Sequence, residues 1–239
     1  MAKKSVAYTL FFPFYERNLY RIYRADLNRI RHLEAESPTG FEFALLRPDD
    51  DRYIRQIESQ AEWLAGRLKA KLEGNGACLA ALHGDQVAGF NLIAFGEVFI
   101  PLVRLKRRFR AGEAWSEHLA VRNEFRRQGI ASALRHRIFE QLREIGVKKL
   151  YGGTLRSNEP ALDLARKLGF VDVADVAYSR VFNRRKWQYH RVGRLVLPCA
   201  ISFSSANDTA WRKRTFLTGS IPSVHGASSL GNPGSMEKH

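Results

Sequence analysis

The chain has 239 residues, 45% of them hydrophobic and 26% charged. Its formal net charge of +15 indicates an anionic partner, such as nucleic acid, phospholipid, an acidic protein or a phosphate-rich cofactor. No stretch reaches the roughly 18 apolar residues of a membrane span, and Cys78 and Cys199 fit neither a disulfide framework nor a metal-ligand spacing. We therefore expect one cytoplasmic globular domain with extensions and no bound metal.

The first 40 residues are expected to form an N-terminal extension. Pro13 interrupts a short apolar run, and charged residues follow where a signal peptide would need small ones, which argues against export. Residues 19–27, "LYRIYRADL", alternate in polarity as a strand does, and "PTG" at 38–40 ends the unit.

A regular pattern begins at residue 41. The sequence predicts a strand over 41–46, a helical region over 48–74 that opens with acidic residues, and a hairpin over 78–95 that turns at 83–86. Residues 100–114, "IPLVRLKRRFRAGEA", break the pattern and are predicted to form a basic loop. Its cations are expected to attract an anionic partner.

The next strand, residues 115–121, leads through the turn "RRQGIA" at 126–131 into a helix. Residues Ile130, Leu134, Ile138 and Leu142 recur four apart and form one helical stripe. Since the first N–H groups of a helix lack intrahelical partners and carry the positive end of its dipole, this turn suits a phosphate-bearing ligand. Many strand-to-helix turns need a glycine and bind nothing, so the motif alone does not establish a ligand site.

The remaining pattern predicts a strand over 148–155, a short helix within 158–170, and a pair of strands, 171–175 and 176–183. The segment 183–191, "NRRKWQYHR", interleaves cations with aromatic residues. A last strand is possible over 195–204. The Gly-, Ser- and Pro-rich residues 219–239 are expected to be disordered.

Two fragments together resemble a known family. "RRQGIA" fits R/Q-x-x-G-x-G/A, and "NEPALDLARKLGF" at 158–170 fits N-x-x-A-x-x-L-x-x-x-L-G-F. In this order and spacing they are similar to motifs of the GNAT superfamily of N-acyltransferases. The resemblance implies an α/β fold with a mixed, mostly antiparallel sheet, in which the parallel strands 115–121 and 148–155 splay apart, flanked by helices. The GNAT-like domain is then expected over 41–190, followed by a basic extension over 191–239.

The resemblance also implies a site for acetyl-coenzyme A as the acyl donor. The pyrophosphate would be cradled by backbone N–H groups of Arg126, Arg127, Gln128, Gly129, Ile130 and Ala131. Main-chain groups of Leu119, Ala120 and Val121 would bind pantetheine, as a strand adds to a sheet edge. Asn158 matches the family asparagine that reaches the cofactor arm, and it is equally well explained as a helix N-cap.

Glu117 is the candidate general base, because some family members place a base at this strand position. Strict alternation would put it on one face with Leu119 and Val121, and His118 on the other. The alternative for Glu117 is an ordinary strand carboxylate paired with a basic residue. Relatives often carry a tyrosine as general acid where this chain has Ala165, so the acid is either absent or replaced, with Tyr151 and Tyr178 as weak substitutes.

The leading hypothesis is an N-acetyltransferase that moves acetyl from acetyl-coenzyme A to a primary amine by direct attack. One alternative is an acyltransferase whose donor is an acidic acyl carrier protein. Others are a nucleic-acid-binding module built on 183–191, for which no known binding motif is present, and a GNAT-like binding domain without activity. The sequence does not name the acceptor.

Overall fold

An eight-stranded sheet forms the centre of the computed structural model, which describes residues 15–30, 38–182 and 184–192. The strands follow the order β10-β9-β1-β8-β7-β4-β3-β2. Within that sheet β7 and β8 pair in parallel, and the other recorded neighbours are antiparallel. The bounds are β1 Tyr15–Asp26, β2 Glu42–Leu45, β3 Gly76–His83, β4 Gln86–Ala94, β7 Glu113–Val121, β8 Lys149–Leu155, β9 Val171–Val181 and β10 Arg184–Arg191. The predicted mixed, mostly antiparallel sheet is confirmed.

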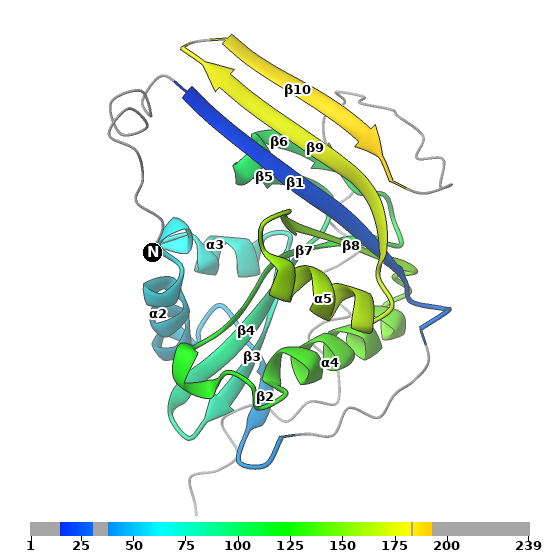
Figure 1. Cartoon of the computed structure of the whole chain (residues 1–239). Coiled ribbons are helices and arrows are strands. Elements are labelled where there is room, and N and C mark those ends of the chain that lie inside the picture. The colour runs from blue at the N-terminus through cyan, green and yellow to red at the C-terminus, as the bar shows by residue number, and fades with distance from the viewer. Residues whose placement is uncertain (1–14, 31–37, 183, 193–239) are drawn as a thin grey trace, which may run out of the picture.

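Helices cover both faces of the sheet (Figure 1). The helices are α2 (Asp51–Gln60), α3 (Leu68–Glu73), α4 (Ile130–Glu144) and α5 (Glu159–Lys167), and 3-10 turns lie at Glu62–Leu64, Pro101–Val103 and Asn123–Phe125. One apolar cluster joins the sheet to α4 and α5, and a second joins it to α2 and α3. Within the described residues, no helix is long and apolar enough to cross a membrane.

The stripe predicted on α4 is confirmed: Ile130, Leu134, Ile138 and Leu142 are each at most 1% exposed. Burial of one apolar side chain of this size contributes about 1.5–3 kcal/mol, so the stripe accounts for much of the attachment of α4 to the sheet. The first turn of α4 is thereby held at a fixed place beside the end of β7.

The basic segment 100–114 is not a loop, as the sequence led us to expect. Its central part forms a hairpin with the residues before it, in which β5 (Glu97–Ile100) pairs with β6 (Leu105–Arg108). Apolar side chains interrupt the cations, and those of Val98, Ile100 and Val103 are buried in a third cluster under β1 and β9. The hydrophobic alternation therefore decides the structure; Arg104, Lys106, Arg108 and Arg110 are exposed, whereas Arg107 packs over the rings of Phe109 and Tyr151.

Residues 171–183 were also misread, since β9 is one continuous strand and not a pair. No turn residue separates Asp175 from Val176, and the buried carboxylate of Asp175 is neutralised by Arg21 of β1. The polar residue at the expected boundary between the two strands is therefore one member of an interior ion pair.

The strand expected near residues 19–27 is present as β1, and it lies inside the sheet. It pairs with β8 from Tyr20↔Leu155 to Asp26↔Lys149, and with β9 on its other edge. A Cβ added at Gly153 would stand 2.3 Å from Tyr20 Cε1 and 2.8 Å from the Arg21 carbonyl oxygen. A segment set apart as an extension by sequence thus contributes an interior strand. The possible strand 195–204 and the tail 219–239 lie outside the described residues.

Candidate functional site

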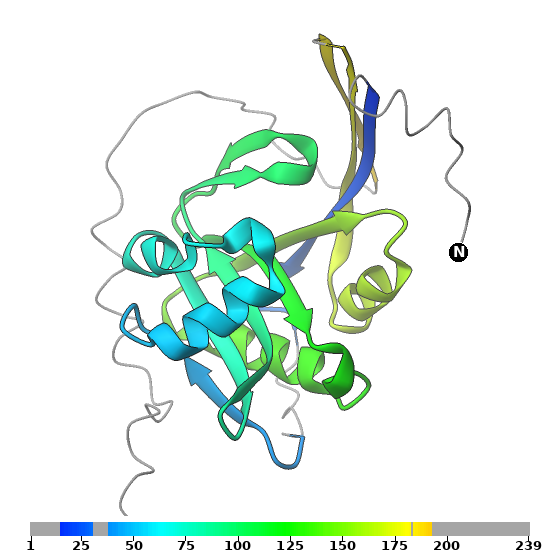
Figure 2. The ribbon, with the colours of Figure 1, turned by 90° about the vertical axis from the view of Figure 1, so that its left-hand side faces the viewer.

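The two parallel strands separate halfway along their length. Pairing between β7 and β8 runs from Glu113↔Lys149 to Trp115↔Tyr151 and then ends, although both strands continue. Figure 2 shows them diverging toward different sides of the molecule. Residues 117–121 are partly exposed despite their central place in the sheet. One edge of β7 is thus open to a ligand, as the family resemblance implied.

A glycine turn lies at the end of this opening. Gly129 precedes α4 with φ +79°, a left-handed conformation that favours glycine, and Arg127 also has a positive φ of 65°. A Cβ added at Gly129 would meet no atom within 4 Å, so the space beside its backbone is empty. The first N–H groups of α4 therefore adjoin open space into which an anionic group could fit.

A pocket of about 210 Å³ joins the turn to the end of β7. It is lined by Val121, Phe125, Arg126, Arg127, Gly129, Ile130, Ala131, Ser132 and Leu164. Most of the residues predicted to bind the pyrophosphate are therefore brought together with Val121; Gln128 is exposed beside them but is not part of the lining. Phe125, which no motif identified, and the motif residue Leu164 add an apolar wall to the pocket.

The other predicted cofactor residues lie close by in the fold. Leu119 packs on the α4 side of the sheet and Ala120 on the α2 side, so their main chain lies between the two clusters. The Val121 carbonyl accepts a hydrogen bond of 3.3 Å from Arg126 Nε. Asn158 caps α5, because its side chain accepts from Ala161 N at 3.4 Å; its role toward a cofactor stays a prediction.

Glu117 lies in a β-bulge, which changes the face expected for it. Leu92 of β4 pairs with His118 and Ile93 pairs with Ser116, so Glu117 is the extra residue on β7. The bulge breaks the alternation, and Glu117 turns away from the side of Leu119 toward α3. The prediction that His118 lies opposite Glu117 is therefore wrong.

The Glu117 carboxylate is paired with a lysine of α3. Lys71 Nζ lies 2.8 Å from each carboxylate oxygen, and the Glu117 side chain is only 5% exposed. Lys71 also lies 5.9 Å from the Trp63 ring, which in turn meets the His118 ring edge-on at 5.5 Å. Burial lowers the pKa of His118, so its imidazole is neutral at pH 7. The Glu117 carboxylate, the Lys71 ammonium and the rings of Trp63 and His118 thus lie together at the bulge.

The positions considered for a general acid give little support to one. Ala165 is buried in the α4–α5 cluster. The Tyr151 hydroxyl donates to Glu113 at 3.3 Å, and burial followed by the nearby Glu113 charge raises its pKa. Tyr178 is fully buried beneath Trp187. Both tyrosines pack in the third cluster, where strand packing explains them.

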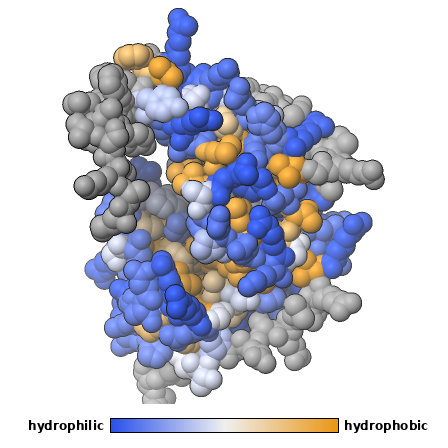
Figure 3. Space-filling model, in the orientation of Figure 1, coloured by the Kyte–Doolittle hydropathy of each residue, from blue (hydrophilic) through white to orange (hydrophobic). Residues whose placement is uncertain are grey.

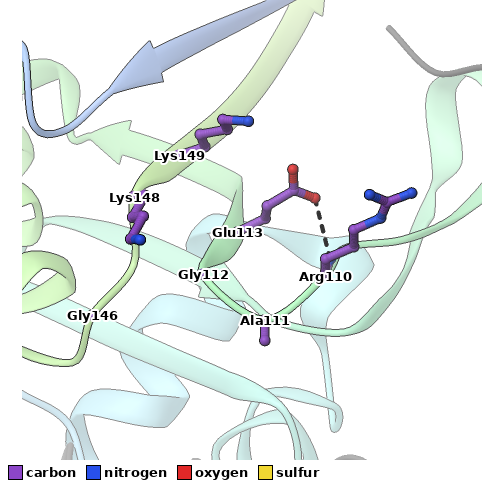
Figure 4. Close-up of a pocket in the computed structure, with 7 residues that line it drawn as sticks. All are labelled: Arg110, Ala111, Gly112, Glu113, Gly146, Lys148 and Lys149. Carbon is purple, nitrogen blue, oxygen red and sulfur yellow. Dashed lines mark hydrogen bonds between the residues drawn. The ribbon is translucent and has the colours of Figure 1, made fainter.

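A larger hollow of about 430 Å³ lies at the opposite end of β7 and β8 (Figure 4). Arg110, Glu113, Lys148 and Lys149 contribute its charged side chains, and Glu113 accepts a hydrogen bond from Arg110 N at 3.2 Å. Here β7 and β8 are still paired with each other, from Glu113↔Lys149 onward, so neither offers the other's edge to a ligand. Since ligands of parallel strands bind beyond their carboxyl ends, the smaller pocket is the better site.

Comparison with known proteins places this geometry in a family. The model of the acetyltransferase (GNAT) family matches residues 27–170, more than half of the chain. The chain belongs to the GNAT family. It is therefore an acyltransferase, and membership of this family indicates acetyl transfer as the general type of reaction. Comparison with curated proteins gives no match.

Solved structures agree with this fold. A GCN5-related N-acetyltransferase from Sphaerobacter thermophilus is 19% identical with a TM-score of 0.50, over 82% of this chain and 59% of that one. A tandem GNAT protein from the clavulanic acid biosynthesis pathway is 14% identical with a TM-score of 0.50, over 82% and 61%. This GNAT chain thus spans about three fifths of either protein. An aminoglycoside acetyltransferase from a soil metagenomic sample is 20% identical over 54% of this chain and 88% of that one; its TM-score of 0.42 is too low to inform the acceptor.

Proposed function

We propose that this protein transfers acetyl from acetyl-coenzyme A to a primary amine by direct attack. The observation that carries the proposal is the open edge of β7, which leads from the bulge at Glu117 to the Gly129 turn. An extended pantetheine arm can pair with such an edge as a peptide strand would. The empty space beside Gly129 fits the pyrophosphate at the positive end of α4.

The reacting groups then meet at the bulge. Glu117 accepts a proton from the acceptor ammonium, because only the neutral amine has a lone pair with which to attack. The amine nitrogen bonds to the acetyl carbon, a main-chain N–H of β7 polarises the thioester carbonyl, and the C–S bond breaks. Coenzyme A departs as a thiolate. The nitrogen must lose a second proton to become an amide, and that proton passes through water to the thiolate, so the absence of tyrosine at Ala165 does not prevent turnover.

The donor site is tested by filling the space beside Gly129. Gly129→Val should weaken acetyl-coenzyme A binding by at least about 2 kcal/mol, the scale of lost charge-assisted hydrogen bonds. Gly146→Val is the matched control, because Gly146 follows the same helix with φ +77° and also has no atom near an added Cβ. Both variants bear similar backbone strain, and only Gly129 adjoins the smaller pocket. Equal calorimetric affinities in the two folded variants would contradict the donor site.

A further inference from the structure

The ion pair at the bulge poses a problem for an ordinary amine. Glu117 is the only carboxylate that lies within 4 Å of Lys71 Nζ among the described residues, and its side chain is 5% exposed. An acceptor that arrives as a simple ammonium must share this single carboxylate with Lys71. Two positive charges would then meet in a partly desolvated place, where like charges repel strongly.

An acceptor with its own carboxylate resolves this conflict. On the basis of the proposed acetyl transfer, we infer that the acceptor is a zwitterionic amino acid, whose amine pairs with Glu117 and whose carboxylate pairs with Lys71. The four charges then alternate in sign and sum to zero. This pairing needs no further charged residue of the protein, because Lys71 and Glu117 supply both partners.

The geometry of Lys71 suits this double role. Its Nζ has three N–H donors, of which two face the Glu117 oxygens at 2.8 Å. The side chain is 28% exposed, so a third donor can reach a ligand. The Trp63 ring, partly exposed and 5.9 Å from Nζ, offers an apolar surface beside the charges. An amino acid's side chain can rest on that surface.

The surrounding groups do not compete for the carboxylate. His118 packs against Trp63 and Phe90, and burial keeps its imidazole neutral at pH 7. The nearby cation Lys69 of α3 lies 3.3 Å from Asp51 and is 51% exposed. Lys71 is therefore the residue of α3 that can bind the carboxylate of an acceptor at the bulge.

The experiment compares acceptors that differ only in the carboxylate. Release of free thiol from acetyl-coenzyme A is measured with the proteinogenic amino acids, their carboxamides and the corresponding decarboxylated amines. The parent should prefer an amino acid over its carboxamide by about 30-fold in kcat/KM, the scale of one charge-assisted pair. In Lys71→Met that preference should vanish, and kcat/KM for the decarboxylated amine should rise because the competing cation is gone.

Two further variants keep this test decisive. Lys71→Arg retains the charge and should retain the preference, and Lys69→Met is the matched control on the same helix. Carboxamides used as well as amino acids, an unchanged preference in Lys71→Met, or acetylation of Lys71 itself would each overturn the inference. No turnover of any acceptor by protein that binds acetyl-coenzyme A would overturn it too, whereas failure to bind acetyl-coenzyme A contradicts the proposed function.

Discussion

The two edges of β8 differ in how completely they are paired. Toward β1, every residue from Lys149 to Leu155 has a partner; toward β7, pairing stops at Tyr151. Unpaired main-chain groups inside a sheet are costly unless a ligand or water satisfies them. The closed edge holds β8 in place, so the other edge can stay open without the strands collapsing together. The edge of β8 that faces β1 thus stabilises the sheet, and the edge that faces β7 leaves space for a ligand.

Arg21 holds β1, which covers the fully paired edge of β8, against β9. Replacing Arg21 should have the largest predicted effect on stability. Arg21 of β1 is 8% exposed and binds Asp175 through two nitrogens as well as Asp172 of the same strand β9. Arg21→Leu would remove the buried cation from both carboxylates and leave only the half-exposed Arg156, 3.4 Å from Asp175, so the free energy of unfolding should fall by about 3 kcal/mol. Urea denaturation measures this change.

Arg17 supplies the control for that measurement, because it is an exposed arginine on the same strand. Arg17→Leu should change the free energy of unfolding by less than about 0.5 kcal/mol. A loss below about 1 kcal/mol in Arg21→Leu would mean that β1 does not hold the closed side.

The open side should respond chiefly in rate, with a smaller loss of stability because Glu117→Gln also breaks the ion pair with the partly exposed Lys71. Glu117→Gln removes the proposed proton acceptor at the bulge, and thiol release should slow by roughly 100-fold, the usual contribution of general-base catalysis. Affinity for acetyl-coenzyme A should be nearly unchanged. Glu113→Gln alters the same strand at its paired end and should leave the rate within about twofold. Full activity of Glu117→Gln at neutral pH would place the base elsewhere.

Local patterns in the sequence predicted much of the open side. The apolar stripe on α4 and the glycine at 129 follow from helix periodicity and from backbone geometry, both of which are properties of neighbouring residues. The hairpin at 83–86 and the Asn158 cap are local for the same reason. Of these features, Gly129 and Asn158 belong to the family motifs.

Long-range contacts account for what the sequence did not reveal. The place of β1 depends on pairing with residues more than a hundred positions later, such as Leu155 opposite Tyr20. The bulge at Glu117 arises from register with β4, which alternation along β7 alone does not disclose. Lys71 is one of several basic residues in its helical region, and no spacing separates it from the solvent-exposed Lys69.

The smallest predicted effect concerns His118, which lies at the bulge on the open side. Burial lowers the pKa of His118 in the folded protein below its unfolded value of about 6.5. The unfolded chain therefore binds more protons just below that pH, and the folded state should lose stability as the solution is acidified through this range. About one pH unit above 6.5 and higher this contribution is constant, because the imidazole is then neutral in both states.

His118→Phe keeps an aromatic ring against Phe90 and Trp63 and removes the titrating group. The free energy of unfolding, measured by urea at about pH 7.5 and about pH 5.5, should fall less in the variant than in the parent, by at most about 1.4 kcal/mol. Parallel changes in the two proteins would show that His118 does not titrate differently on folding. A smaller loss in the variant would show that folding desolvates His118. At neutral pH this neighbour of Glu117 on β7 then adds no second cation that could compete with Lys71 for the acceptor's carboxylate.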